Sequence, residues 1–332
     1  MTCSVACGTI TILVKMMISK TAATASQMIV LTTGSIITLL LLVLTTSSPI
    51  TQEYLTNLQK TSTFEVYSTP EEHPFKSTEE VIARLGLNVE YLHDTSSIKM
   101  GLPNLSLPES FDSRTQWPNC IHPIRNQARC GSCWAHAASE VLSDRFCIDS
   151  DGKIDVVLSP QDFVSCDIFD YGCNGGSTIF SWLYLRIYGL VVDECKPYTS
   201  QEGKVEECGL IDEGKCVDEK VPFKKYKAEK FYMLNTINAI KEDIYLHGPI
   251  ESGFLVYSDF KDYKSGVYQR GKHTQLLGGH AVKIVGWGKE GDTEYWVVAN
   301  SWGEEWGEKG YFRIAFGECG IENVISGTPK IE

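Results

Sequence analysis

The distribution of cysteine along the chain restricts the possible fold more than any other feature. The 332-residue sequence contains 12 cysteines, and ten of them lie between Cys120 and Cys319. The other two precede a long apolar segment, and residues 49–119 contain none. Such a concentration in a secreted chain is typical of a disulfide framework. We therefore expect a cross-linked C-terminal domain that folds in an oxidising compartment.

An apolar segment near the N-terminus indicates how the chain reaches such a compartment. No charged residue occurs from 21 to 52, Ile36–Leu44 is almost purely apolar, and two lysines lie upstream. This pattern is typical of a secretory signal. We assign residues 1–48 to a signal peptide, with an uncleaved signal anchor as the alternative. Initiation at Met28 would give a signal of more ordinary length. The expected location is the secretory pathway, ending in a lysosome or vacuole or outside the cell, with a membrane-anchored form if the segment is uncleaved.

The net charge limits the kinds of partner that the protein is expected to bind. The formal net charge is −12, and the sequence has no basic block. Nucleic acid is therefore not expected as a partner.

Three regions follow the apolar segment. Residues 49–106 are polar, with Glu79–Leu87 as a candidate short helix, and we interpret them as a pro-segment; a flexible linker or stalk is the alternative. Residues 107–225 carry helical patterns, whereas 226–332 carries β-branched and aromatic runs between glycine-containing loops. A helical half followed by a strand half predicts an α+β fold with a cleft between two subdomains. The expected helices are Trp134–Cys147, Ser159–Cys166 and Thr178–Tyr188, and the expected strands are Gly253–Tyr257, Ala281–Trp287, Tyr295–Ala299 and Tyr311–Phe316.

A cysteine at the start of the first helix is the candidate nucleophile. Cys133 ends the run Cys130-Gly-Ser-Cys133 that opens this helix. The free amides and the dipole of a helix N-terminus stabilise an anion, so the pKa of the Cys133 thiol should be lowered. Among seven histidines, His280 is the one that follows a Gly-Gly pair and begins an apolar strand. It is the candidate base for the thiol.

The strands around Gly291 predict a third member of this site. A hairpin with a symmetric register about residue 290 places His280 opposite Asn300, with Cβ atoms about 5 Å apart. The Asn300 side-chain oxygen would then fix the tautomer of the imidazole and aim its other nitrogen. Nucleophile, base and orienting group together are typical of covalent catalysis of acyl transfer. A one-residue shift in the turn would break this inference.

Three separate motifs resemble those of the papain family of cysteine proteases. Gln127–Trp134 resembles the active-site signature of that family, Cys173-Asn-Gly-Gly176 its cleft-wall loop, and Asn300–Arg313 its asparagine motif. The motifs occur in the family's order, and the resemblance extends over 107–332. It is strongest with the cathepsin B-like branch, through Leu107-Pro-Glu-Ser-Phe-Asp, Leu142–Ile148 and Val256–Gln269.

The resemblance implies a papain-like fold, with a helical half over 107–225 and an antiparallel, barrel-like β half over 226–332 that flank the active-site cleft. It also implies a zymogen. The residues to which it assigns roles are Cys133, His280 and Asn300 in catalysis, Gln127 in the oxyanion hole, Trp302 as a shield over the His280–Asn300 pair, and Gly175, Gly176, Gly279, Ala281 and Val324 in substrate binding. It pairs the cysteines as Cys120–Cys147, Cys130–Cys173, Cys166–Cys208 and Cys195–Cys216, which leaves Cys133 and Cys319 unpaired.

The expected partners are protein or peptide substrates, the chain's own pro-segment as an inhibitor, and cystatin-like inhibitors. No metal or cofactor is expected, and the protein is expected to be a monomer. Val324 falls where cathepsin B has a glutamate that accepts arginine, so we expect a preference for an apolar residue at P2, the second residue before the scissile bond.

Three departures from the family pattern matter. Ala128 replaces the glycine usual after the oxyanion-hole glutamine. His136 replaces a phenylalanine, and we interpret it as a packed or hydrogen-bonded helix residue, with an auxiliary proton role as the alternative. The segment 196–215 is short and has no histidine, whereas cathepsin B has a long occluding loop with two histidines there. We therefore expect an endopeptidase without carboxydipeptidase activity.

Other functions remain as alternatives. Cys130 and Cys133 form a C-x-x-C pair, which a thiol-disulfide oxidoreductase would use, but no βαβ pattern surrounds it. An inactive papain-like binding protein would not need the complete set of nucleophile, base, orienting group and oxyanion donor. A peptide ligase on the same scaffold stays open, because capture of the acyl-enzyme by an amine or by water depends on fine geometry.

Overall fold

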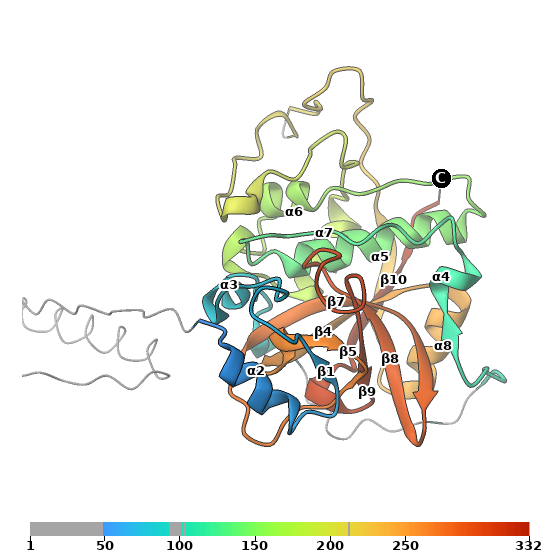
Figure 1. Cartoon of the computed structure of the whole chain (residues 1–332). Helices are drawn as coiled ribbons and strands as arrows, with labels where there is room; N and C mark the ends of the chain where they lie inside the picture. The colour runs from blue at the N-terminus through green and yellow to red at the C-terminus, as the bar shows by residue number, and fades with distance from the viewer. Residues whose placement is uncertain (1–48, 93–100, 102–103, 212, 332) are drawn as a thin grey trace, which may run out of the picture. The chain divides into compact units, whose positions relative to one another are not determined.

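The described residues form a helical half, a β half and an N-terminal region packed against the latter (Figure 1). The computed structural model describes residues 49–92, 101, 104–211 and 213–331. The expected signal peptide or anchor at 1–48 lies outside these residues. Within them, no helix is both long enough and apolar enough to cross a membrane.

The helices are α2 (Gln52–Gln59), α3 (Thr78–Ile82), α4 (Ser113–Gln116), α5 (Cys133–Asp149), α6 (Pro160–Cys166), α7 (Thr178–Ile187) and α8 (Ile237–His247). The strands are β1 (Glu65–Val66), β2 (Phe111–Asp112), β3 (Ala228–Met233), β4 (Ile250–Tyr257), β5 (Tyr263–Ser265), β6 (Val267–Tyr268), β7 (Leu276–Glu290), β8 (Thr293–Ala299), β9 (Tyr311–Ala315) and β10 (Asn323–Pro329). Short 3₁₀ helices occur at Val89–Tyr91, Gly172–Asn174, Ser200–Glu202, Gly209–Ile211, Phe260–Asp262 and Glu318–Gly320.

Helix α5 joins the two halves of the molecule. Fifteen of its 17 residues are buried, so its charged residues need partners inside the protein. Arg145 donates from Nη2 to Asp243 of α8 at 2.6 Å, and Lys283 of β7 donates to Asp144 at 2.8 Å. Breaking such a buried pair costs about 3–5 kcal/mol. The helix that begins at Cys133 is therefore held firmly against the β half.

The β half is one open eight-stranded sheet. The strand order is β3-β10-β4-β7-β8-β9-β6, with β2 paired to β7. The pairs are antiparallel except β6 with β9, which is parallel. Because β3 and β6 lie at opposite ends of this path, the described strands do not close into a barrel. The expected α+β class is confirmed, and the barrel-like β half takes the form of an open sheet.

Residues 49–92 pack on the β half instead of extending away from it. Strand β1 pairs with β5, with Glu65 opposite Ser265. Seven apolar side chains of this region lie in the same buried cluster as the sheet: Ile50, Leu55, Phe64, Val66, Tyr67, Phe75 and Val81. In Figure 1 this region is the blue part of the chain.

The candidate helix at Glu79–Leu87 is shorter than expected. Helix α3 ends at Ile82. The amides of Leu87 and Asn88 donate instead to the carbonyls of Gly279 and Gly176, at 3.1 and 2.9 Å. These bonds to two other parts of the chain replace the helical ones, so the segment leaves the helix.

Four disulfides lie in the helical half. They join Cys120–Cys147, Cys130–Cys173, Cys166–Cys208 and Cys195–Cys216, the pairs that the resemblance implied. Cys133 and Cys319 are the free cysteines of the described chain. The Cys130–Cys133 pair of an oxidoreductase is therefore not formed here.

Candidate active site

Cys133 is the first residue of α5 and is completely buried. Burial raises the pKa of its thiol to about 11, although the backbone amides of Ala281, Gly86 and Trp134 hydrogen-bond to the sulfur and act in the opposite direction. The lowered pKa expected from the helix N-terminus is therefore wrong for this state of the chain. The physical reason is that the sulfur is completely buried, and burial disfavours the charged thiolate more than the nearby backbone groups favour it.

His280 and Asn300 meet, but not through the register that the sequence suggested. Strands β7 and β8 pair with Glu290 opposite Thr293, and the register shifts by one between Ile284 and Gly286. Residue 282 rather than 280 then faces residue 300. His280 and Asn300 are diagonal neighbours, which long and aromatic side chains can bridge. His280 Nε2 lies 2.8 Å from Asn300 Oδ1, so the predicted contact is confirmed and the predicted register is wrong.

Hydrogen bonds fix the tautomer of His280. Asn300 Oδ1 also accepts the Ser301 amide at 2.8 Å, so this atom is the carbonyl oxygen and His280 Nε2 carries the hydrogen. His280 Nδ1 then has a free lone pair, and it is buried without a hydrogen-bond partner. Because Ala281, the next residue, donates to the Cys133 sulfur, this nitrogen belongs to the strand segment that contacts the thiol.

The surroundings keep the imidazole neutral. Burial lowers the pKa of His280 to about 4. The Trp302 ring lies 4.8 Å from the imidazole, and Trp302 is itself buried. The buried Trp302 ring therefore packs against the His280 imidazole.

Gln127 is buried at the N-terminal side of α5. Its Oε1 accepts the Ser301 hydroxyl at 2.6 Å, which identifies Nε2 as the amide nitrogen. One Nε2 hydrogen goes to the Cys130 carbonyl at 2.8 Å and the other to the Arg84 carbonyl at 2.9 Å. Both Nε2 hydrogens are therefore used, and one of them is bound by a carbonyl of the N-terminal region.

The N-terminal region passes between two glycine walls. Gly176 donates its amide to the Gly86 carbonyl at 2.8 Å, and Leu87 donates to the Gly279 carbonyl at 3.1 Å. A side chain at Gly175 would not fit, because its Cβ would lie 2.7 Å from the Gly86 oxygen. Gly175, Gly176 and Gly279, expected to bind substrate, thus contact residues 86–88 of the same chain.

The Leu87 side chain fills a pocket beside these walls. A Cβ on Gly253 would lie only 2.6 Å from Leu87 Cδ2, and Ala281 pairs with Gly253 across β4 and β7 and belongs to the same buried cluster as Leu87. Val324 is also buried, but it lines a small adjacent cavity with Leu92. Ala281 and Leu87 thus share one buried cluster, whereas Val324 lines a cavity with Leu92.

Two residues at this site were not identified from the sequence. Gly253 is one, and the feature that could have identified it is a glycine inside an apolar strand pattern. Glu251 is the other; it lies two residues away on the same strand face, accepts Trp182 Nε1 at 2.6 Å, and burial raises its pKa well above the ordinary value. A single glutamate in this part of the sequence gives no signal that its side chain is buried. Among the described residues, no group of His, Cys, Asp and Glu side chains could hold a metal ion.

Comparisons with known proteins agree with this geometry. Residues 107–328 match the family model of the papain family cysteine proteases. The chain is 39% identical over 319 residues to "Cathepsin B-like cysteine proteinase 4" of Caenorhabditis elegans, which covers 85% of this chain and 94% of the relative. It is 41% identical over 249 residues to the "Gut-specific cysteine proteinase" of the same organism, with 68% and 75% covered.

Solved structures extend the likeness to the N-terminal region. The structure of "proCathepsin B S9 from Trypanosoma congolense" matches with a TM-score of 0.74 and 32% identity, over 86% of this chain and all of that one. The proform of the ragweed pollen allergen "Amb a 11 cysteine protease" matches with a TM-score of 0.57 and 29% identity, over 69% of this chain and 67% of that one. The family model over 107–328 and these relatives place the chain in the papain family of cysteine proteases, as a cathepsin B-like peptidase.

Proposed function

We propose that the chain is the zymogen of a cysteine endopeptidase in which Cys133 is the nucleophile and His280 its base. The observation that carries this proposal is the fixed imidazole: Nε2 is held by Asn300 at 2.8 Å, and the lone pair of Nδ1 is unused. A group oriented in this way can take the thiol proton and return it to the leaving amine.

The reaction would follow from these positions. The Cys133 sulfur attacks the carbonyl carbon of the peptide bond while His280 Nδ1 takes the proton. The resulting oxyanion accepts hydrogen bonds from Gln127 Nε2 and from the Cys133 amide. The amine leaves with the proton from His280, and a thioester remains on Cys133. Water then attacks the thioester while the same imidazole takes its proton; the acid is released, and the proton passes from His280 to the Cys133 sulfur, which regenerates the thiol.

The test of this mechanism is labelling of the thiol. After activation at mildly acid pH, an epoxide inhibitor should label one site per molecule, at Cys133. Cys133→Ala should lower kcat by at least about 10⁴-fold, because no other group can form the acyl-enzyme, and Cys319→Ser should leave both labelling and activity unchanged. Peptidase activity in Cys133→Ala above background would contradict the mechanism.

We also propose that residues 49–106 are an inhibitory pro-segment and that maturation cuts near Leu107. In support, Arg84 occupies the oxyanion donor and residues 86–88 fill the cleft between Gly176 and Gly279. Leu87 bridges Gly176 in parallel and Gly279 in antiparallel fashion. The zymogen thiol would be unreactive because it is buried and neutral. The packing of 49–92 favours this role over a linker, and the proform relatives favour it too.

The contact of Gly86 with Gly131 offers a sharp test. A Cβ on Gly86 would lie 1.8 Å from the Gly131 oxygen, so alanine cannot fit without displacing the segment. In the full-length proenzyme at pH 6, iodoacetamide should label Cys133 of Gly86→Ala at least about tenfold faster than the wild type. Thr56→Ala, on the exposed face of α2, is the matched control and should behave as wild type. Equal rates for Gly86→Ala and wild type, or an active protein that still begins near Thr51, would contradict the proposal.

The finer specificity is proposed from the same contacts. Leu87 occupies the pocket over Gly253 and Ala281, which favours an apolar P2 residue. Segment 196–215 has no histidine, and it exposes Glu202, Glu206 and Glu207, which would repel a C-terminal carboxylate. We therefore propose an endopeptidase that does not release C-terminal dipeptides, and efficient stepwise release of dipeptides would contradict this. The secretory pathway, inhibition by cystatin-like proteins and a monomeric state remain part of the proposal.

A further inference from the structure

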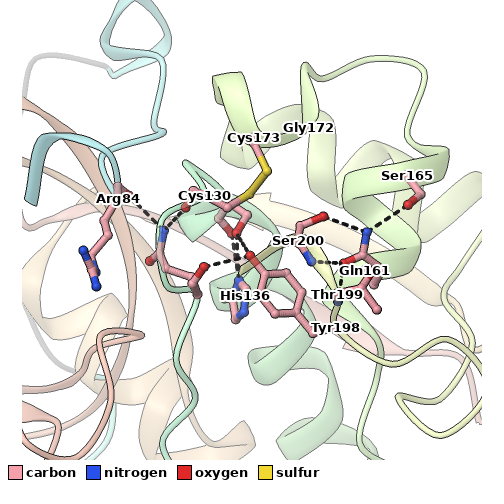
Figure 2. Close-up of a disulfide and its surroundings, with 12 residues drawn as sticks. Arg84, Cys130, His136, Gln161, Ser165, Gly172, Cys173, Tyr198, Thr199 and Ser200 are labelled. Atoms are coloured by element: carbon pink, nitrogen blue, oxygen red, sulfur yellow. Dashed lines mark hydrogen bonds between the residues drawn. A yellow bond between two sulfur atoms is a disulfide. The ribbon is translucent and has the colours of Figure 1, made fainter. Parts of the chain in front are cut away.

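A series of buried hydrogen bonds connects helix α5 to the backbone of Gln127. His136 Nδ1 lies 3.0 Å from the Ser132 carbonyl and 3.3 Å from the Ser132 hydroxyl. The Ser132 hydroxyl lies 2.9 Å from the Tyr198 hydroxyl, which in turn donates to the Gln127 carbonyl at 2.9 Å. Figure 2 shows Tyr198 and His136 side by side, close to the Cys130–Cys173 disulfide. None of these groups touches the thiol in the mechanism above.

The direction of every hydrogen bond in this series is determined. The Gln127 carbonyl can only accept, so the phenolic hydrogen of Tyr198 points to it. Tyr198 has no second hydrogen, so Ser132 must donate to Tyr198. The Ser132 carbonyl also can only accept, so His136 carries its hydrogen on Nδ1. Burial, with the Arg125 charge acting in the same direction, lowers the pKa of His136 to about 3, so His136 is neutral and keeps this tautomer at any pH where the enzyme would work.

These hydrogen bonds restrain a strained backbone next to Gln127, in addition to the bond from the Gln127 amide to the Ser301 carbonyl at 2.9 Å. Ala128 follows Gln127 with a φ of +52°, a conformation that is strained for a non-glycine residue. Ser132 is the N-cap of α5, yet its side chain makes no capping hydrogen bond. It is turned to Tyr198 instead. Serine at an N-cap usually stabilises its own helix, but the Ser132 side chain instead bonds to Tyr198, which bonds to the Gln127 backbone.

Tyr198 is itself held from the other side. Gln161 of α6 accepts the amides of Thr199 and Ser200 at 2.9 and 3.1 Å, and it donates to the Ser200 hydroxyl at 2.9 Å. The His136 ring packs edge-on against Tyr198, with centroids 4.7 Å apart. The tyrosine hydroxyl therefore has little freedom to leave the Gln127 carbonyl.

We propose that Tyr198, Ser132 and His136 form a positioning network that fixes the Gln127 backbone and thereby aims its side-chain amide into the oxyanion hole. The inference rests on the proposed function of Gln127 and adds three residues that do not touch the substrate. The peptide group between Gln127 and Ala128 is held by two bonds, from its amide to Asn126 Oδ1 at 2.9 Å and from Tyr198 to its carbonyl. Without the bond to Tyr198, only the amide side stays anchored, and the strain at Ala128 can displace the carbonyl. The side-chain amide would then no longer be preorganised for the oxyanion.

Kinetics on the activated enzyme test the proposal. Loss of one oxyanion donor typically costs about 10²–10³ in kcat, so misplacement of that donor in Tyr198→Phe should cost about tenfold, with KM changed less than twofold. Ser132→Ala should lower kcat about fivefold, and His136→Phe about threefold, because the hydrogen bonds that they remove lie progressively further from Gln127. Tyr245→Phe, at an exposed position of α8, is the matched control and should leave kcat unchanged.

Two further measurements separate positioning from a general loss of structure. The Ki of a peptide aldehyde, whose adduct needs the oxyanion hole, should rise in parallel with the loss of kcat. The rate at which iodoacetamide alkylates Cys133 should not change, because alkylation does not use the oxyanion hole. In a Gln127→Ala background, Tyr198→Phe should cost less than twofold more, since its effect acts through the missing amide.

The outcomes discriminate between this inference and the proposed function. If Gln127→Ala lowers kcat strongly while Tyr198→Phe and Ser132→Ala stay within twofold of wild type, the positioning network is refuted and the oxyanion role stands. An additive loss in the double variant, or a slower alkylation of Cys133 by iodoacetamide, also refutes the network. If Gln127→Ala itself leaves kcat unchanged, the oxyanion role fails and the network fails with it. Ser132→Ala, the smallest change, decides the matter if Tyr198→Phe does not fold.

Discussion

The helical half and the β half hold their parts of the site by different means. All four disulfides of the described chain lie between Cys120 and Cys216, in the helical half. The β half has no cross-link among its described residues; it relies on the ladder of β7 and β8 and on a buried aromatic cluster around Trp302. His280 lies on a strand of the β half, whereas Gln127 and Gly176 lie on loops of the helical half.

The difference follows from backbone hydrogen bonding. A strand in the middle of a sheet has its amides and carbonyls satisfied on both sides, so its side chains are positioned without further help. A loop lacks this ladder, and its position must come from disulfides and from side chains that bond to its backbone. In the helical half the Cys130–Cys173 disulfide and Tyr198 supply these restraints. Loops near the thiol should thus be sensitive to changes that the strands tolerate.

The largest effect is expected from the β half and concerns chemistry alone. His280→Ala should lower kcat/KM by about 10³–10⁴ because the base is lost, and Asn300→Ala by about 10–100 because only the orientation of the imidazole is lost. Both variants should keep the wild-type Tm within about 3 °C, since the ladder of β7 and β8 remains. A His280→Ala enzyme with more than a tenth of wild-type kcat/KM would contradict the assignment of the base.

The second effect concerns the helical half and its cross-links. Cys130→Ser/Cys173→Ser, made in the Cys133→Ala proenzyme, opens a loop with a sequence separation of 43. The chain-entropy estimate for a loop of that size is about 4 kcal/mol, which corresponds to roughly 10 °C in Tm for a domain of this size. Cys319→Ser, which removes the free cysteine of the β half, is the control and should shift Tm by about 2 °C or less. Equal Tm losses in the two variants would remove the proposed contrast between the halves.

The same contrast explains which features the sequence could predict. The helices and strands near Cys133 and His280 followed from period and composition, because regular structure leaves a repeating pattern. The pairing of His280 with Asn300 was predicted, but the register was wrong, because the turn is centred between Gly291 and Asp292 instead of on residue 290, and the bulge between Ile284 and Gly286 shifts it again. Sequence reasoning named His136, but not its link through Ser132 and Tyr198 to Gln127. Gln127, Ser132 and His136 are close in the sequence, whereas Tyr198 is far from them, and only the fold brings it to them.

The third effect concerns the pocket that Leu87 fills in the proenzyme. A substrate with Phe at P2 should exceed one with Arg at P2 by at least about tenfold in kcat/KM, or roughly 1.4 kcal/mol, because Arg would be desolvated without a partner. Glu251 is no such partner, since it is bound to Trp182 and its pKa is raised well above the ordinary value by burial. Val324→Glu should narrow the gap. Equal turnover of the two substrates by the wild type would refute the proposed specificity.

The smallest effect concerns the pH dependence of a helical-half loop. Asp170 lies against Gly176, whose Cβ, if present, would be 2.8 Å from the Asp170 carboxyl carbon. Burial, with the nearby Asp167 charge adding to it, raises the pKa of Asp170 from 3.8 to about 8. The folded state therefore binds the proton more tightly than the unfolded state, so this group contributes stability below about pH 4 that is lost as the pH rises toward 8.

Asp170→Asn keeps the oxygen that accepts the Ser177 amide at 2.8 Å and removes the charge. In the Cys133→Ala proenzyme, Asp170→Asn should therefore reduce the fall in Tm between pH 4.5 and pH 8 by about 2 °C or more, whereas Asp151→Asn, in an exposed turn, should not. The same fall in Tm for Asp170→Asn and the parent protein would mean that this loop does not titrate with folding.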